Sequence, residues 1–451
     1  MLNYDIQAGF SRVNITPPLG IDISGYYVRR IADGVLDEIE INTLALRTED
    51  KTVLLMAFDA MGMNKEYIDS VKEYITAETK IPADAIFIHS THSHTTPRLG
   101  NGEPLTEQEK EYAQTVRRAG VNAAVLAIAD LKPARMGWGV GAVKNVAFNR
   151  RYLMKDGSTR TNPGVNNPDI EKSIGLLDER LNVLRFNRED GSNLVLLNFG
   201  NHPDTIGSTK ISADWPGFTR RTFERAIENS KCVFFNGAQG DINHVNVFPK
   251  GGDMNDVIID FDDVPRGYGH ARHLGNVVAG AAMQVYDKVC YTSVDSLKYK
   301  QKYIDVPMNK PLPEEMEEAR YINDMHNAGR DAELPYKGMM LTTMVADAAR
   351  KVRLENANDN FPLLLSAISI GNVAMFGIPG EPFTGVGLGL KEAAGWDMVL
   401  PCCNTNAKDG YFPMQDSYDE GGYEAKSSSF KGGIAETIIA EGQKLLGELK
   451  K

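Results

Sequence analysis

Short apolar runs that alternate with amphipathic segments constrain the fold of this chain more than any other feature of its sequence. Residues 52–59 (TVLLMAFD) and 85–90 (AIFIHS) have the character of buried strands, and residues 64–79 between them have the apolar spacing of a helix. The same alternation returns at 232–236 (CVFFN) and 268–288. It is typical of helices packed on a mostly buried sheet. We therefore expect an α/β fold with a mixed β-sheet core flanked by helices.

Local signals mark several boundaries of these elements. Thr106 and Glu109 have the spacing of a capping box, which predicts the start of a long helix that ends near Asp130. Residues 182–186 and 193–199 are apolar and are separated by a polar segment that contains Asp190-Gly191, which predicts a hairpin.

The second half of the chain continues the pattern after a polar alternating strand at 296–306. Two charged helices, at about 314–328 and 340–355, indicate a helical insertion at about 307–360. The further elements that we expect are a helix at 216–229, one strand at 363–375, a Gly-rich turn at 377–380, a helix that ends near 394, a strand at 398–402 and a last helix at 432–449. Without an internal repeat or a Ser/Pro-rich linker, residues 1–451 are expected to form one catalytic-type domain.

Charge and composition narrow the classes of partner. The chain of 451 residues has 49 Lys and Arg against 60 Asp and Glu, a net charge of -11 without a basic run, which disfavours nucleic acid and anionic membranes. Its 4 cysteines are too few for a disulfide framework. We find no transmembrane segment and no signal peptide, so we expect a cytoplasmic protein, or an exported one if a leader was removed. The oligomeric state stays open.

Five of the eight histidines lie at or just beyond predicted strand ends, where α/β enzymes place their sites: His89, His92, His94, His202 and His244. His92 and His94 are two residues apart, so in extended chain they point to the same side and can share a metal ion or a substrate group. A bare His-x-His pattern also fits solvated histidines at a polar strand end.

Three other segments follow predicted strands. His202 comes directly after LVLLNFG and is either functional or a structural hydrogen bonder. Glu381 stands at a Gly-bounded turn, where it is either functional or favours a helix N-terminus. The loop NGAQGDINH places Asp241, Asn243 and His244 at the same sheet edge, although it also fits an ordinary polar loop.

Nine short motifs occur in one order along residues 9–426: GFSRVNITPPLG, THSHTTP, NVAFNRR, NPDIEKSIGLLDERLNVLRF, NFGNHPDT, SADWPG, GAQGDIN, IPGEPFTGVG and YFPMQDSYDEGGYEA. In this order the chain resembles the N-terminal catalytic domain of the neutral/alkaline, non-lysosomal ceramidases. That family consists of zinc-dependent amide hydrolases that cleave N-acyl sphingosine. The resemblance implies a hydrolase with a Zn²⁺ cofactor and a role in lipid, specifically sphingolipid, metabolism.

The resemblance also implies a metal-ligand set. By their places in the motifs, His92 and His202 match the two histidine ligands and Glu381 matches the carboxylate ligand. The distance back from the terminal YEA motif places the tyrosine ligand at Tyr411. Two histidines, a carboxylate and a phenol suit zinc.

Four further residues take their expected roles from the same comparison. His94 matches the histidine that contacts substrate or moves a proton, and Tyr423 matches a tyrosine that contacts substrate. Arg150 matches the basic residue that holds the scissile carbonyl or the oxyanion, with the adjacent Arg151 as the alternative.

Two departures from the family bear on mechanism and substrate. Asn243 stands where ceramidases have their serine nucleophile, so we expect zinc-activated water to attack, with Asp241 or His244 as base or supporting partner. The sequence also stops about 25 residues after the last motif, where ceramidases continue into an immunoglobulin-like domain. The expected substrate is ceramide or another lipid, or alternatively a small soluble acylated compound cleaved at an amide or ester bond. A non-catalytic metal-containing binding protein is the third interpretation.

Overall fold

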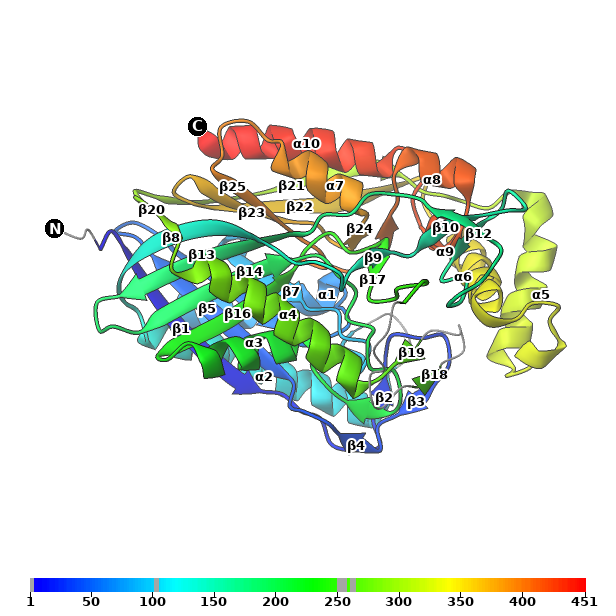
Figure 1. The fold of residues 1–451 in the computed structure, drawn as a ribbon, viewed down its shortest axis with the longest axis horizontal. Helices are drawn as coiled ribbons and strands as arrows, with labels where there is room; N and C mark the ends of the chain where they lie inside the picture. Colours follow the sequence, from blue (N-terminus) through cyan, green and yellow to red (C-terminus); the bar gives the residue numbers. More distant parts are fainter. Residues whose placement is uncertain (1–3, 101–104, 250–257, 260–264) are drawn as a thin grey trace.

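The strands gather mainly in two sheets that lie face to face, as Figure 1 shows for the computed structural model, which describes residues 4–100, 105–249, 258–259 and 265–451. The larger sheet has nine strands, of which eight run in the order β16 (Ser230–Asn236), β14 (Asn193–Phe199), β13 (Arg180–Arg188), β8 (Lys132–Ala142), β1 (Ile6–Asn14), β5 (Glu40–Arg47), β6 (Thr52–Phe58) and β7 (Ile86–Ser90), while β20 (Cys290–Thr292) pairs with β8. The smaller sheet has the order β21 (Leu297–Pro307), β22 (Asn360–Ile370), β23 (Val373–Gly377) and β25 (Met398–Cys402).

Three strand pairs in these sheets are parallel, and each is joined by a crossover helix. They are β6–β7 through α1 (Lys65–Thr79), β14–β16 through α3 (Asp214–Ala226), and β23–β25 through α7 (Thr384–Lys391). Parallel neighbours need such a crossover because their ends lie at opposite edges. The other pairs within the two sheets are antiparallel, which confirms the mixed α/β class.

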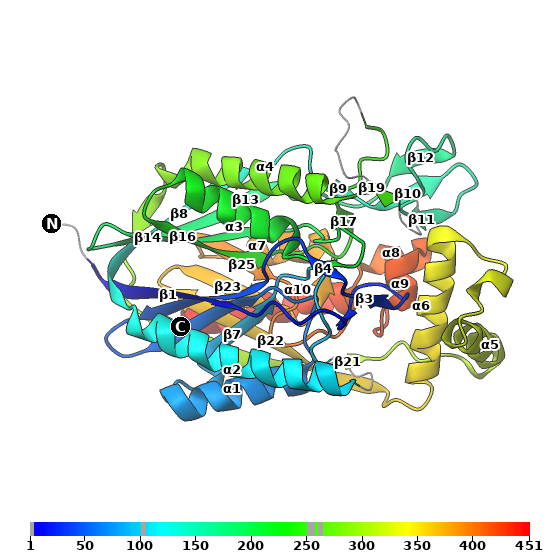
Figure 2. The ribbon, with the colours of Figure 1, turned by 90° about the horizontal axis from the view of Figure 1, so that it is seen from below.

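The helices form the outer layers of an α/β/β/α arrangement (Figures 1 and 2). On the large sheet lie α1, α3, α2 (Glu107–Ala129) and α4 (Tyr268–Tyr286), and on the small sheet lie α7 and α10 (Ile434–Lys450). Between the sheets, Leu54 and Ile88 of the large sheet share one buried core with Ile368, Met375 and Leu400 of the small sheet. Burial of these apolar faces against each other holds the two sheets together.

Shorter elements surround one end of the two sheets, at the right of Figure 1. The helices here are α5 (Met316–Asn327), α6 (Gly338–Leu354), α8 (Gln415–Glu420) and α9 (Tyr423–Ser427), with 3₁₀ turns at Pro313–Glu315 and Asp331–Glu333. A third 3₁₀ turn, Ala83–Ala85, directly precedes β7. The short strands form the groups β2 (Asp22–Ile23) with β3 (Arg30–Ile31), β4 (Gly34–Val35) with β15 (Lys210–Ile211), β9 (Phe148–Asn149) with β17 (Ile242–Asn243), β18 (Ile258–Ile259) with β19 (Pro265–Arg266), β24 (Glu381–Pro382) with β26 (Tyr411–Phe412), and β10 (Arg151–Met154) with β11 (Thr159–Thr161) and β12 (Ile170–Ser173).

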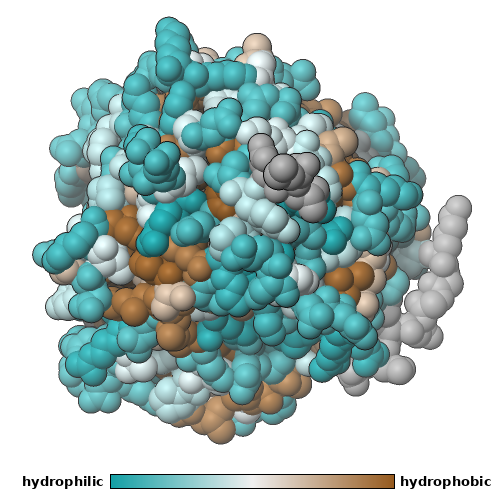
Figure 3. Space-filling model, turned by 90° about the vertical axis from the view of Figure 1, so that its left-hand side faces the viewer, coloured by the Kyte–Doolittle hydropathy of each residue, from teal (hydrophilic) through white to brown (hydrophobic). Residues whose placement is uncertain are grey.

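The opposite end, seen in Figure 3, presents a mostly hydrophilic face broken by hydrophobic patches. Of the helices that the structure describes, none is both long and apolar enough for a membrane crossing.

The local signals in the sequence are confirmed where side chains set the boundary. Thr106 accepts from the backbone of Glu109 while the Glu109 carboxylate accepts from the backbone of Thr106, so the capping box opens α2. Gly191 has φ 83 in the β13–β14 hairpin turn, as the Asp-Gly signal predicts. The helical pair α5–α6 stands between β21 and β22, which are neighbours in the small sheet; that this segment is an insertion stays a prediction.

One expectation about the strands needs correction. The run at 363–375 is not a single strand: it divides into β22 and β23, which pair as a hairpin around Gly371. Gly371 has φ 57, the left-handed conformation that glycine adopts without strain. The division of the strands between two facing sheets adds detail to the mixed sheet core that the sequence predicts.

A glycine in β1 sets how closely α2 approaches the large sheet. A Cβ on Gly9 would lie 2.1 Å from the carbonyl oxygen of Ala127 and 2.7 Å from the backbone nitrogen of Leu131. Because both neighbours are backbone atoms, Gly9→Ala must separate β1 from α2. We expect it to lower the free energy of unfolding by about 1–3 kcal/mol, measured by denaturant titration.

Gly447 in α10 offers the matched control, because a Cβ there meets no atom within 4 Å. Gly447→Ala should stabilise the protein by about 0.5–1 kcal/mol through helix propensity. Equal effects of the two substitutions would contradict the packing argument for Gly9.

Candidate metal centre

The loops that follow three strands bring distant parts of the sequence together at one end of the sheets. His92 and His94 follow β7, His202 follows β14, and Glu381 begins β24, four residues after β23 ends. The histidines therefore come from the large sheet and the glutamate from the small sheet. All four side chains are buried, and they meet beyond the carboxyl ends of β7, β14 and β23.

The three histidine rings form a tight cluster. Their centroids are 4.8 Å apart for His92 and His94, 4.9 Å for His92 and His202, and 5.5 Å for His94 and His202. One ring nitrogen from each lies within 4.8 Å of the others, so the described residues include a buried histidine triad that can hold a metal ion. Glu381 adds an oxygen, since its Oε2 is 3.2 Å from His92 Nε2 and 3.3 Å from His202 Nε2.

Backbone carbonyls fix which nitrogen of each ring carries the proton. His92 Nδ1 is 2.5 Å from the Met61 carbonyl oxygen, and His202 Nδ1 is 2.9 Å from the Gln239 carbonyl oxygen. A carbonyl oxygen only accepts, so each Nδ1 donates and each Nε2 presents a lone pair to the centre. A carbonyl behind the ring is the usual support of a metal-ligating histidine.

The resulting centre brings three acceptor atoms close together: His92 Nε2, His202 Nε2 and Glu381 Oε2. Within the described residues, neither the His202 nitrogen nor the Glu381 oxygen is satisfied by a hydrogen bond. Burial lowers the pKa of His202 to about 4. Lone pairs that face one another in a buried site repel unless a cation lies between them, and this nitrogen and oxygen set fits zinc.

The backbone of His92 has a strained conformation. His92 has φ 76, which is uncommon for a residue with a side chain, and its amide donates to the Ala60 carbonyl at 2.8 Å. A left-handed conformation at such a residue costs on the order of 1 kcal/mol and is found mainly at functional sites.

His94 lies beside the ligand atoms, with its Nε2 3.2 Å from His92 Nε2. Its other nitrogen, Nδ1, is 3.8 Å from Asp204 Oδ1. Burial lowers the pKa of His94 well below its ordinary value. The geometry therefore admits His94 both as a third histidine ligand and in the proton-moving role that the resemblance implies.

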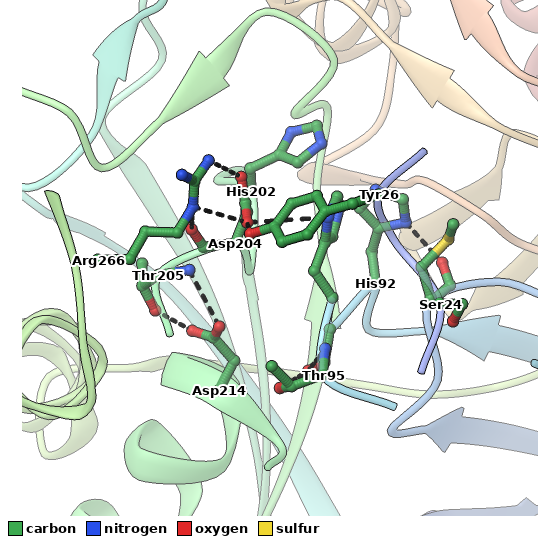
Figure 4. A network of polar contacts seen from close by, with 12 residues as sticks. Ser24, Tyr26, His92, Thr95, His202, Asp204, Thr205, Asp214 and Arg266 are labelled. Carbon is green, nitrogen blue, oxygen red and sulfur yellow. Dashed lines mark hydrogen bonds and ion pairs between the residues drawn. The ribbon is translucent and has the colours of Figure 1, made fainter. Parts of the chain in front are cut away.

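Asp204 is held in a network that the sequence analysis did not assign (Figure 4). Arg266 donates to it through Nη2 at 2.8 Å and Nε at 3.1 Å, and the Tyr26 hydroxyl donates to it from the other side. Burial by itself would raise the pKa of Asp204, but Arg266 and His94 hold it well below its ordinary value. The NHPDT motif contains Asp204 and was the available signal, whereas Arg266 and Tyr26 lie outside the strand-end patterns.

Arg150 is fixed beside the centre by a buried ion pair. Its Nε donates to Glu424 at 2.7 Å, and its Nη2 donates to the Gly240 carbonyl at 2.8 Å and to the Tyr411 hydroxyl at 3.2 Å. Arg151 turns instead to Ser417 and Glu420. Of the two candidate arginines, only Arg150 contacts a residue of the expected ligand set.

Two tyrosines from the C-terminal motif face each other above Glu381. The rings of Tyr411 and Tyr423 are 5.6 Å apart in an edge-to-face arrangement. Tyr411 is the parallel partner of Glu381 in the β24–β26 pair, which fixes the phenol near the carboxylate.

The side chains of the Asp241–His244 loop form hydrogen bonds with residues that surround the loop. Asp241 accepts from the backbone and hydroxyl of Thr384, at 2.8 and 2.9 Å, and burial raises its pKa to about 6. Asn243 donates to Asn162 at 2.8 Å, and His244 Nε2 lies 2.9 Å from the Pro265 carbonyl. None of the three is among the residues that line the cavity at the metal centre, and their part in the reaction stays a prediction.

A cavity of about 600 Å³ opens onto the centre. Polar and aromatic side chains and two glycines make up nearly all of its lining: Gly25, Tyr26, Tyr27, Met61, Asn64, Glu66, His92, His94, Arg353, Glu381, Lys408, Asp409, Gly410, Tyr411, Tyr423, Ser427 and Ser429. Among the described lining residues, Met61 is the one with an apolar side chain that is not aromatic.

Solved structures share this architecture, although no family model and no curated protein matches the sequence. The neutral ceramidase from Pseudomonas aeruginosa superimposes with a TM-score of 0.72 at 16% identity, covering 99% of this chain and 74% of that one. A ceramidase complexed with C2 gives a TM-score of 0.72 at 14% identity, with 99% and 76% covered. This chain has the neutral ceramidase fold. The resemblance seen in the motifs is thus confirmed for the ceramidase-like fold.

Removal of one ligand should empty the ceramidase-like centre of metal. We expect His202→Ala to lose most of the bound zinc, because Nε2 of His202 has no partner other than the centre. Metal analysis of protein purified without chelator measures this loss. His326→Ala, which removes a histidine that pairs with Asp331 on the helical segment, should keep the wild-type zinc content. Full zinc retention in His202→Ala would refute the ligand assignment.

Proposed function

We propose that this protein is a zinc-dependent hydrolase that cleaves an amide or ester bond in a small polar substrate. The observation that carries the proposal is the buried cluster in which Glu381 Oε2 lies 3.2 Å from His92 Nε2 and 3.3 Å from His202 Nε2. In this proposal His92, His202, Glu381 and Tyr411 hold the metal. A zinc ion in such a site acts as a Lewis acid and makes hydroxide available near neutral pH.

Arg150 binds the oxygen of the scissile carbonyl in this mechanism. Its guanidinium is buried, stays charged, and is aimed at the Tyr411 hydroxyl, with Glu424 fixing it from behind. A preorganised donor of this kind contributes on the order of 3 kcal/mol to stabilisation of a developing oxyanion.

His94 moves the proton to the leaving group. Its Nε2 faces the centre and its Nδ1 faces Asp204, whose charge supports the protonated ring while the proton is in transit. Tyr423, in the cavity wall opposite, contacts the substrate. The nucleophile is water, since Asn243 has no ionisable hydroxyl and no acyl-enzyme forms there.

The cavity lining supports a polar substrate over ceramide. A long acyl chain requires an apolar wall, and among the described lining residues Met61 alone has an apolar side chain that is not aromatic. Tyrosine faces, serine hydroxyls and charged groups instead match a compact polar molecule. The ceramidase neighbours support hydrolysis as the reaction at the centre. The substrate preference depends on the residues that line this chain's own cavity.

Matched acyl compounds test this function. The zinc-loaded protein should hydrolyse N-acetyl and O-acetyl compounds faster than N-palmitoyl compounds of the same amine in detergent, with His202→Ala as the inactive control. A clear preference for the long chain would restore the lipid substrate. If the zinc-loaded protein hydrolyses none of these compounds, the result would favour the alternative interpretation, a non-catalytic metal-containing binding protein.

Quenching the enzyme during turnover tests the nucleophile. Direct attack by water predicts an unmodified protein mass and no burst of leaving group. An acyl group on a side chain, for example Ser93 or Thr95 beside the centre, would refute direct attack.

Loss of the Glu424 charge should misplace Arg150. We expect Glu424→Gln to lower kcat about tenfold to hundredfold while the zinc content stays at the wild-type level, because Glu424 acts on the guanidinium. Glu420→Gln removes the matching carboxylate of Arg151 and should leave kcat nearly unchanged. A loss of zinc in Glu424→Gln would show that the pair supports the metal rather than the substrate.

A further inference from the structure

Lys408 brings a positive charge into the cavity without a carboxylate partner. No acidic group among the described residues lies within ion-pair distance of its ammonium, whose contact is the thioether sulfur of Met61 at 2.8 Å. A thioether is a weak acceptor and leaves an ammonium largely unsatisfied. The stem of Lys408 rests on Gly62, where an added Cβ would lie 2.2 Å from its Cδ. The charge is therefore held at the cavity wall by packing.

Arg353, on α6, is the second such cation. Its Nη2 donates to the Ser429 hydroxyl at 2.8 Å, and it has no ion pair within the described part of the chain. Its neighbour Arg350 pairs with Asp347 at 2.7 Å, as most arginines of this protein pair with acids. The other N–H groups of Arg353 are available to a ligand in the cavity that this residue lines.

The acidic groups of the cavity form no ion pair with these two cations. Glu381 lies 3.2 and 3.3 Å from the two histidine nitrogens, and its charge acts on Lys408 without an ion pair. Asp409 and Glu66 also line the cavity, and among the described residues neither forms an ion pair with Lys408 or Arg353.

A concave site with two cations that form no ion pair within the described residues, next to a centre proposed to hold a metal cation, attracts a negative ligand. We propose that the substrate carries an anionic group, a carboxylate or a phosphate, that Lys408 and Arg353 bind while the acyl bond lies at the metal centre. The inference rests on the proposed hydrolase function and adds its substrate class. Neutral ceramide has no anionic group for these two side chains.

Four acetamides test the substrate class through one product, acetate. N-acetyl-β-alanine and N-acetylphosphoethanolamine carry the two anionic groups, and N-acetylpropylamine and N-acetylethanolamine are their neutral matches. We expect kcat/KM of the zinc-loaded enzyme to be at least about tenfold higher for an anion than for its match, as a charge-assisted contact provides. The better of the two anions identifies the group.

Variants connect that preference to the two side chains. Lys408→Met and Arg353→Met should each bring the anion-to-neutral ratio of kcat/KM close to one. Lys110→Met, which removes an exposed cation paired with Glu107 on α2, should keep the wild-type ratio. A wild-type ratio near one, or a ratio that both cavity variants retain, would overturn the inference while the hydrolase function stands.

If none of the four amides is cleaved, that result counts against the proposed hydrolase function only. The anion site is then tested by the binding of inorganic phosphate. Calorimetric titration of inorganic phosphate compares the zinc-loaded wild type with the Lys408→Met/Arg353→Met double variant. Affinity at least about tenfold weaker in the double variant supports an anion site formed by these residues. Equal affinity, or no binding to the wild type, would overturn it, since phosphate held by the metal alone is insensitive to both substitutions.

Discussion

The packing of the small sheet on the large sheet is the constraint on which the centre depends. Glu381 belongs to the small-sheet side and the histidines to the large-sheet side, so the distances of 3.2 and 3.3 Å between them are set by how the sheets meet. His89 joins the two sides near the centre, with Nδ1 2.7 Å from the Cys403 carbonyl and Nε2 accepting from the Asn236 amide at 2.9 Å. Burial lowers the pKa of His89 to about 3, so this bridge is neutral and keeps one donor and one acceptor.

Further polar contacts fix the same interface at the strand ends. Asn198, on β14, donates to the Phe235 and Pro401 carbonyls at 3.0 and 2.9 Å, which ties β14 to β16 and to β25. Such directional bonds inside an apolar layer permit one relative placement of the sheets, since any shift leaves buried polar groups unpaired. The apolar core supplies the cohesion, and these bonds supply the register that a metal site needs.

The sequence predicted the elements whose signals are local. The capping box at Thr106 and the Asp190-Gly191 turn act over three or four residues, and the structure has both. The division into two sheets is a tertiary property, because the apolar runs of β7 and β23 are alike in composition and nothing within either run states which strand it will pair with. The hairpin at Gly371 was missed because its two strands read as one continuous apolar run.

The candidate site divides in the same way. His92, His202 and Glu381 stand in motifs at strand ends, and the resemblance to the ceramidases implied that they meet. Asp204 depends on Arg266, 62 residues away, and on Tyr26, and no pattern in the sequence relates the three. The ion pair between Asp204 and Arg266 weakens the effect of the Asp204 charge on His94. A carboxylate that is neutralised by an arginine stabilises a protonated histidine less than an unpaired carboxylate does. That favours a neutral ring, whose free nitrogen can accept a proton.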